Sequence, residues 1–131
     1  TAQALIQKFP DAKLILDLHR DAFADDKAAR KKMVLNINGE AAAKIMFVVG
    51  NGNPNWQENY QLAQKLTALM NKQYPGIMRS IDSNNYFTTY NQELSNRSLI
   101  VEVGAECTTL EEVLASARIL AKSIGDFIKS S

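Results

Sequence analysis

The sequence predicts a single α/β domain with a mixed sheet flanked by helices in three layers. Three apolar runs carry this prediction, at residues 14–16, 45–49 and 99–101. Each run is continuous rather than alternating, which is typical of strands buried on both faces. Two long amphipathic segments, at 55–74 and 110–128, supply helices to cover them. Helices and strands in this order fit a layered α/β domain.

Length and composition describe an ordinary globular domain. The 131 residues are enough for one domain with a real core, and 46% of them are apolar. The net charge of +1 gives no case for nucleic acid or an anionic membrane as a partner. The single cysteine, Cys107, excludes an intrachain disulfide and a cysteine-based zinc knuckle. No apolar run approaches the roughly 20 residues that a membrane helix needs, and no signal peptide is visible.

The first quarter of the chain predicts a helix, a strand and a charged connection. Residues 2–9 place their apolar side chains on one side of a helix, which a proline then ends. The strand of residues 13–18 follows, and along it Asp17 and His19 point to the same face. Residues 22–32 combine alanines with charges of both signs, which is typical of a solvated loop or short exposed helix.

The middle of the chain predicts two strands around a tight turn. They span residues 33–37 and 44–49, and Asn38-Gly39 between them is a strong hairpin signal. The second strand runs into a glycine- and asparagine-rich loop at 50–54. In open α/β sheets this is the edge where ligands bind, so we expect the loop to lie near the site.

Both long helices have identifiable starts. Asn55 can cap the helix of residues 55–74, with Glu58 three residues further on. Thr109 and Glu112 form a full capping box at the head of the last helix. The segments between the helices are a strand at 77–81, a polar irregular stretch at 82–96 and a strand at 100–103.

Two of the predicted strands end on a reactive side chain. His19 is the only histidine, and Glu102 follows three apolar residues, where a carboxylate is costly to bury unless paired or coordinated. Neighbouring strands would deliver both groups to one edge of the sheet. We therefore expect His19 and Glu102 to share a site, with Asp17 and Asp21 able to hold the imidazole ring.

More than one interpretation of these groups stays open. His19 can be a satisfied structural histidine, and Glu102 can be paired with Arg97 or Arg20. The functional interpretation is metal-assisted hydrolysis, in which the histidine binds the metal and the glutamate takes a proton from metal-bound water. A catalytic zinc site typically has three protein ligands, so the others would be nearby aspartates or residues outside this chain. The polar-aromatic loops at 51–56 and 86–92 suit sugar or peptide contact, or are ordinary turns.

Five strings of residues resemble the stage II sporulation protein P family. They are Asp17-Leu18-His19-Arg20-Asp21-Ala22, Met46-Phe47-Val48-Val49-Gly50, Asn53-Pro54-Asn55-Trp56, Tyr90-Asn91-Gln92 and Leu99-Ile100-Val101-Glu102-Val103-Gly104. Their order and spacing agree with the family across nearly the whole chain, and the first and last strings are the specific ones. More remotely, the histidine and the late glutamate match zinc-dependent N-acetylmuramoyl-L-alanine amidases.

The resemblance implies a zinc-dependent peptidoglycan hydrolase with a zinc-amidase-like fold. Such enzymes cut the amide between N-acetylmuramic acid and L-alanine; the family is also credited with cleaving the peptide crosslink, and acts in forespore engulfment. By the matching motif, His19 would be a zinc ligand and Glu102 the catalytic acid/base. Possible supporting or substrate-contacting residues are Asp17, Arg20, Asp21, Asn91 and Arg97. The implied partners are peptidoglycan, a lytic transglycosylase and a membrane protein that recruits both, at an extracytoplasmic, membrane-anchored location on the sporulation septum.

The resemblance also implies that this chain holds only part of a domain. The family's catalytic domain begins earlier, with a strand whose histidine-containing motif supplies the first zinc ligand. We therefore expect residues 1–131 to be the later part of one catalytic domain that lacks its first strands. A truncated sheet leaves an open edge, which invites dimerisation. The alternatives are a non-catalytic module that binds peptidoglycan or a partner, and a metal-free hydrolase using carboxylates.

Overall fold

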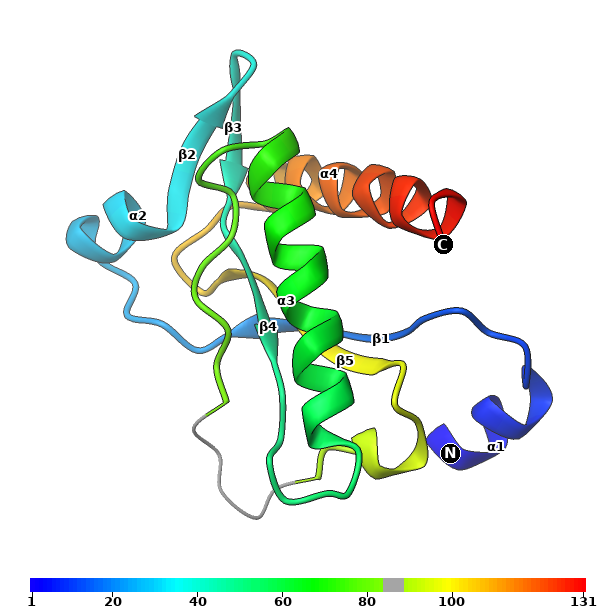
Figure 1. Ribbon diagram of the computed structural model, residues 1–131. Helices are drawn as coiled ribbons and strands as arrows, with labels where there is room; N and C mark the ends of the chain where they lie inside the picture. Colours follow the sequence, from blue (N-terminus) through cyan, green and yellow to red (C-terminus); the bar gives the residue numbers. More distant parts are fainter. Residues whose placement is uncertain (84–88) are drawn as a thin grey trace.

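The structure is a computed structural model that describes residues 1–83 and 89–131. Helices and strands alternate along the chain except in its middle, where three strands follow one another (Figure 1). The helices are α1 (Ala2–Lys8), α2 (Lys27–Met33), α3 (Trp56–Gln73) and α4 (Leu110–Lys129), with a short 3-10 turn η1 (Gln92–Leu94). The strands are β1 (Ile15–Asp21), β2 (Val34–Ile37), β3 (Glu40–Ala43), β4 (Ile45–Val48) and β5 (Ser98–Ala105). The predicted α/β class is confirmed.

A three-stranded mixed sheet in the order β1-β5-β4 holds the centre of the structure. Strand β1 runs parallel to β5, and β4 runs antiparallel to it. The register places His19 directly opposite Glu102, so the two strands that bear the candidate groups are neighbours, as the sequence predicted. Strand β1 forms one edge of this sheet, and dimerisation through that edge stays a prediction that the mass in solution will check.

The helices α3 and α4 pack on one face of this sheet. Alternate residues of the strands point toward them, and Phe47 and Val101 are fully buried there against Leu66 and Met70 of α3. Because the described α3 and α4 share this face, two layers replace the three that the continuous apolar runs predicted. The apolar runs are continuous for a different reason: on the second face of the sheet, β4 and β5 contribute a small apolar cluster.

That second cluster consists of Met46, Val48 and Ile100, with Tyr90 packed against it. An apolar floor of this kind makes the runs continuous without requiring a helix above it. It leaves the face on which the strands carry their ionisable side chains open to a ligand.

Several local predictions need correction. Strand β1 continues to Asp21, three residues beyond the predicted end, because its pairing with β5 extends that far. The charged segment forms α2, which Asp26 caps by accepting a hydrogen bond from the Ala29 amide at 2.8 Å. It is the short, largely exposed helix that its charges indicated, except that Ala29 and Met33 are buried. The predicted strand at 77–81 makes only isolated bridges.

The start of α3 also differs from the prediction. Asn55 makes no side-chain cap. Its Nδ2 donates instead to the carbonyl oxygen of Glu93, at 3.1 Å. Beside it, the fully buried Gln92 accepts from the Gly50 amide and donates to the Val48 carbonyl, both at 2.9 Å. The Asn55 side chain thus bonds to a distant carbonyl instead of capping its own helix. The two hydrogen bonds of the Gln92 side-chain amide fix η1 against the end of β4.

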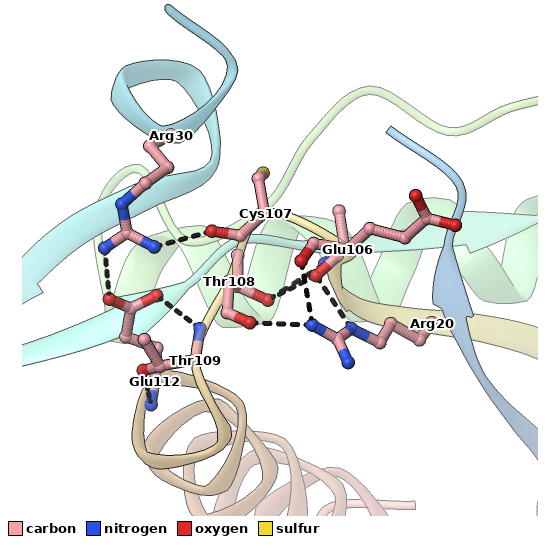
Figure 2. A network of polar contacts seen from close by, with 8 residues as sticks. Arg20, Arg30, Glu106, Cys107, Thr108, Thr109 and Glu112 are labelled. Carbon is pink, nitrogen blue, oxygen red and sulfur yellow. Dashed lines mark hydrogen bonds and ion pairs between the residues drawn. The ribbon is translucent and has the colours of Figure 1, made fainter. Parts of the chain in front are cut away.

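The capping box at the head of α4 is confirmed and is tied to α2. Glu112 accepts from the Thr109 amide at 3.0 Å and from Nη2 of Arg30 at 2.7 Å (Figure 2). Burial alone raises the pKa of Glu112, but the hydrogen bonds from Arg30 and Thr109 outweigh it and lower the pKa below its ordinary value. The ionised carboxylate is therefore the form that the fold stabilises.

We expect Glu112→Ala to lower the free energy of unfolding by about 1–2 kcal/mol at pH 7, from the lost cap and its hydrogen bonds. Since the pKa of Glu112 is lowered by folding, its contribution is present above the ordinary glutamate pKa and is lost as pH falls through the folded value. Urea unfolding should show a smaller difference in the free energy of unfolding between the wild type and Glu112→Ala at pH 3 than at pH 7. Glu111→Ala, at an exposed position on the same turn, is the matched control and should change little.

Candidate active site

A cleft of about 360 Å³ opens on the sheet face opposite α3 and α4. Strand alternation explains its composition, because odd-numbered positions of β1 and even-numbered positions of β4 and β5 share this face. The lining combines ionisable groups, an apolar floor and one irregular segment. Its residues are Asp17, His19, Asp21, Met46, Val48, Asp82, Tyr90, Asn91, Ile100 and Glu102.

The His19 imidazole is held by one of the two predicted aspartates. Its Nε2 lies 3.0 Å from Oδ1 of Asp17, and about half of each side chain is exposed. The hydrogen bond to Asp17 raises the pKa of His19; partial burial opposes this, and the negative charges of Asp17 and Glu102 add to it. Asp21, the other predicted holder of the ring, pairs elsewhere.

Glu102 has the environment of an acid/base group. Its Oε2 is buried and has no hydrogen-bond partner among the described residues. Burial is the main cause that raises the pKa of Glu102, the negative charge of Asp21 adds to it, and the positive charges of His19 and Arg79 oppose it. A carboxyl group with a raised pKa and an unpaired oxygen in a cleft is suited to accepting and returning a proton.

Arg79 is a residue of this region that the sequence did not single out. Its Nη1 lies 2.6 Å from Oδ2 of Asp21, with each side chain about one-fifth exposed. The guanidinium also lies over the ring of Phe23, 5.6 Å from its centroid. An isolated arginine after two apolar residues belongs to no motif, so only the tertiary structure brings it near Glu102.

Arg20 and Arg97, both predicted as contacts or ion-pair partners, direct their side chains away from the cleft. Arg20 donates to backbone carbonyls between β5 and α4. Arg97 precedes β5, and its Nη2 lies 3.4 Å from the Pro10 carbonyl oxygen. Neither arginine is among the cleft residues. An ion pair with Arg20 or Arg97, which the sequence left open, therefore does not explain the burial of the Glu102 carboxylate.

The polar-aromatic loops divide between structural and cleft positions. Tyr90 and Asn91 line the cleft with backbone φ angles of 52° and 60°, a region that non-glycine residues rarely occupy. Asparagine adopts this region more readily than most residues, whereas a tyrosine there is strained, and strain of this kind concentrates at functional sites. Asn53 is buried and donates to the Gly50 carbonyl, so the earlier loop is ordinary turn structure there. The predicted Tyr86-Phe87 contact lies outside the described residues.

The described side chains do not by themselves complete a metal site. No group of three or more histidine, cysteine, aspartate or glutamate residues within 1–83 and 89–131 is arranged to hold an ion. His19 offers one imidazole that is already hydrogen-bonded to Asp17. No helix in the described part of the chain is both long and apolar enough to cross a membrane.

The geometry defines an α/β domain with an imidazole and a carboxyl group of raised pKa on neighbouring parallel strands. The family model of Stage II sporulation protein P (SpoIIP) matches residues 1–125. The chain is 36% identical over 110 residues to Stage II sporulation protein P of Bacillus subtilis (strain 168), which covers 82% of this chain and 26% of that protein. The chain therefore belongs to the stage II sporulation protein P family, and spans about a quarter of the length of this relative. No solved structure matches it.

Proposed function

We propose that this chain is the later part of the catalytic domain of a peptidoglycan hydrolase, an N-acetylmuramoyl-L-alanine amidase with a zinc-amidase-like fold that acts in sporulation engulfment. The observation that carries the proposal is the register of β1 and β5, which sets His19 beside Glu102, a carboxyl group with a raised pKa and an unpaired buried oxygen. Membership of a sporulation family supports the setting.

In this proposal Glu102 moves the proton of the hydrolysis. Its carboxylate takes a proton from the water that attacks the amide carbonyl, and the protonated acid returns it to the departing nitrogen of L-alanine. Burial suits Glu102 to both roles because it raises the pKa toward the working pH. The apolar floor beneath Tyr90 would accept the less polar part of the stem peptide, and Asn91, which also lines the cleft, would hydrogen-bond its amides.

The test of the reaction is the structure of the products. Full-length protein should digest purified sacculi to release stem peptides with a free L-alanine amino group, detected by mass spectrometry. Products with new free ends only within the crosslink would replace the amidase by the endopeptidase activity, the other reaction we propose for the family. Intact sacculi that still bind the protein would favour the alternative, a non-catalytic peptidoglycan-binding module.

We propose zinc as the cofactor, with His19 as one of its ligands. The described side chains supply this imidazole but not a complete ligand set, so the remaining ligands would come from other residues or a partner. Full-length protein should contain about one zinc per molecule. Because catalytic zinc sites use about three protein ligands, losing one in His19→Ala should reduce this zinc content severalfold. Unchanged zinc content in His19→Ala would exclude His19 as a ligand. Asp26→Ala is the control, because Asp26 is an exposed cap that does not line the cleft.

The electrostatic neighbours of Glu102 predict how the pH dependence of hydrolysis will shift. Asp21→Asn removes a negative charge that raises the pKa of Glu102 and releases Arg79, whose charge lowers it. Because Glu102 acts as a base when ionised, the acid limb of kcat/KM should move to lower pH. Arg79→Met should move the same limb to higher pH. Shifts in the same direction for both variants would contradict this account.

The same proposal extends to partners and location. We infer that the substrate is the glycan strand with its stem peptides, and that a lytic transglycosylase and a membrane recruiter act with this enzyme at the sporulation septum, on the extracytoplasmic side. Co-purification of the full-length protein from sporulating cells, with the His19→Ala variant as a catalytically impaired bait, tests these partners.

A further inference from the structure

The register between strands β1 and β5 shifts immediately beyond the pair formed by His19 and Glu102. His19 pairs with Glu102, but the next pair joins Asp21 to Ala105, so β5 carries one residue more than β1 over this interval. Gly104 lies in this interval with φ +70°, a conformation that glycine adopts without strain. The extra residue makes a β-bulge, and bulges interrupt the regular ladder of backbone hydrogen bonds. The carbonyls that follow the bulge need other partners.

The Ala105 carbonyl accepts from the amide and hydroxyl of Thr108 within the turn, and Arg20 supplies further donors from the neighbouring strand (Figure 2). Its Nε donates to the Ala105 carbonyl oxygen at 2.8 Å. Its Nη2 donates to the carbonyl oxygens of Thr108, at 2.7 Å, and Glu106, at 3.1 Å. One planar guanidinium therefore gathers three carbonyls of the turn between β5 and α4. The fixed fork of donors makes arginine suited to this task, whereas a lysine ammonium acts as a single point.

The position of Arg20 in β1 links this clamp to the cleft. It stands between His19 and Asp21, whose side chains face the cleft, so strand alternation sends the Arg20 side chain to the other face. Arg20 thus does not touch a ligand in the cleft. It holds the backbone that begins three residues after Glu102, at Ala105, and does so from the strand that carries His19.

A second arginine braces the same turn but acts farther from the bulge. Nη1 of Arg30 donates to the Cys107 carbonyl at 2.5 Å, and Nη2 pairs with Glu112 at the start of α4. Arg30 comes from α2, not from β1. It therefore stabilises the turn without joining the two strands of the site, which makes it the matched comparison.

We propose that Arg20 is a positioning residue, which clamps the backbone beyond the Gly104 bulge and so keeps Glu102 in register beside His19. This inference rests on the proposed function of that pair. Of the two roles that the sequence left open for Arg20, it assigns the supporting one, through the β5 backbone, rather than a substrate contact.

The first test follows the backbone and requires no activity. In the 131-residue chain, the Glu106 amide donates to the Asp21 carbonyl across the bulge at 3.1 Å. Arg20→Met should speed hydrogen exchange of this amide about tenfold or more, and should shift the amide resonances of His19 and Glu102. Arg30→Met should leave these three signals as in the wild type. Arg20→Lys should restore them partly, since it keeps the charge but not the fork.

The second test separates positioning from general stability. In full-length protein on a soluble muropeptide, Arg20→Met should lower kcat about 10- to 100-fold with KM little changed, because displaced catalytic groups lose rate rather than affinity. Arg30→Met should stay within about twofold of the wild type. Unchanged exchange and resonances in Arg20→Met, or equal effects of Arg20→Met and Arg30→Met, would overturn the proposal.

The comparison of Arg20 and Arg30 remains decisive if a variant does not fold or if the full-length protein shows no amidase activity. If Arg20→Met does not give the circular dichroism of the folded chain, Arg20→Lys carries the same comparison with Arg30→Lys, and the same results decide it. If full-length protein shows no amidase products, the proposed function fails, while the resonances and exchange of the chain still decide whether Arg20 holds the register.

Discussion

Replacing Glu102 with glutamine is expected to lower kcat for amide hydrolysis by about a thousandfold or more in the full-length protein. Glutamine keeps the size of the side chain but cannot accept and return a proton. The carboxyl group is the one in the cleft with a buried oxygen lacking a described partner, and burial raises its pKa. Removing its charge also relieves a desolvation cost, so the fold should be retained or slightly stabilised.

The measurement is the initial rate of release of stem peptide from a soluble muropeptide, beside thermal unfolding of the same samples. Glu106→Gln is the matched control, since this glutamate follows the same strand with an exposed side chain, and the hydrogen bonds described for it use its backbone amide and carbonyl. The control should keep wild-type kcat. A Glu102→Gln enzyme that retains more than about a tenth of wild-type kcat would show that another group moves the proton.

The pairing of His19 with Glu102 was predictable because the chemistry lay in two strands with the same pattern. Each had an apolar run followed by ionisable residues, four in the first strand and one in the second, and neighbouring strands in an α/β sheet bring such residues together. The hydrogen bond of Asp17 to His19 followed in the same way, from the period of two along a strand. These features depend on local sequence, so one strand at a time was enough to find them.

The other features of the site depend on contacts between distant residues. Arg79 reaches Asp21 across 58 positions of the chain, and Arg20 reaches the Thr108 carbonyl across 88. A sequence pattern shows that an arginine is present but not which acceptors its long side chain will reach. The same reason explains Asn55, whose capping role was displaced by the carbonyl of Glu93.

Gly104→Ala is expected to lower the free energy of unfolding by about 2–5 kcal/mol, the sum of the cost of a left-handed backbone and of overpacking. A Cβ at this position would lie 2.6 Å from Oγ1 of Thr108, 2.9 Å from Val113 and 3.0 Å from Ala43. All three distances are at or below the closest approach of real side chains. Since small domains have only about 5–15 kcal/mol of net stability, much of it would be lost.

The Thr108 hydroxyl cannot move aside cheaply to admit the methyl group. It accepts from the Ala105 amide at 3.1 Å and donates to the Ala105 carbonyl at 2.7 Å, and Arg20 holds that same carbonyl. The substitution therefore strains the bulge, the turn and the arginine clamp together. Beyond its cost in stability, any folded fraction should show displaced amide resonances for Glu102.

Urea unfolding measures this effect, and Gly125→Ala provides the matched control. Gly125 lies inside α4 with no atom near the position of an added Cβ, so alanine there should raise stability by about 1 kcal/mol. The same change of residue thus has opposite expected signs at two positions. If Gly104→Ala unfolded at the wild-type urea concentration, the bulge would be relaxing into another register, and Glu102 would no longer be fixed beside His19 by the backbone described here.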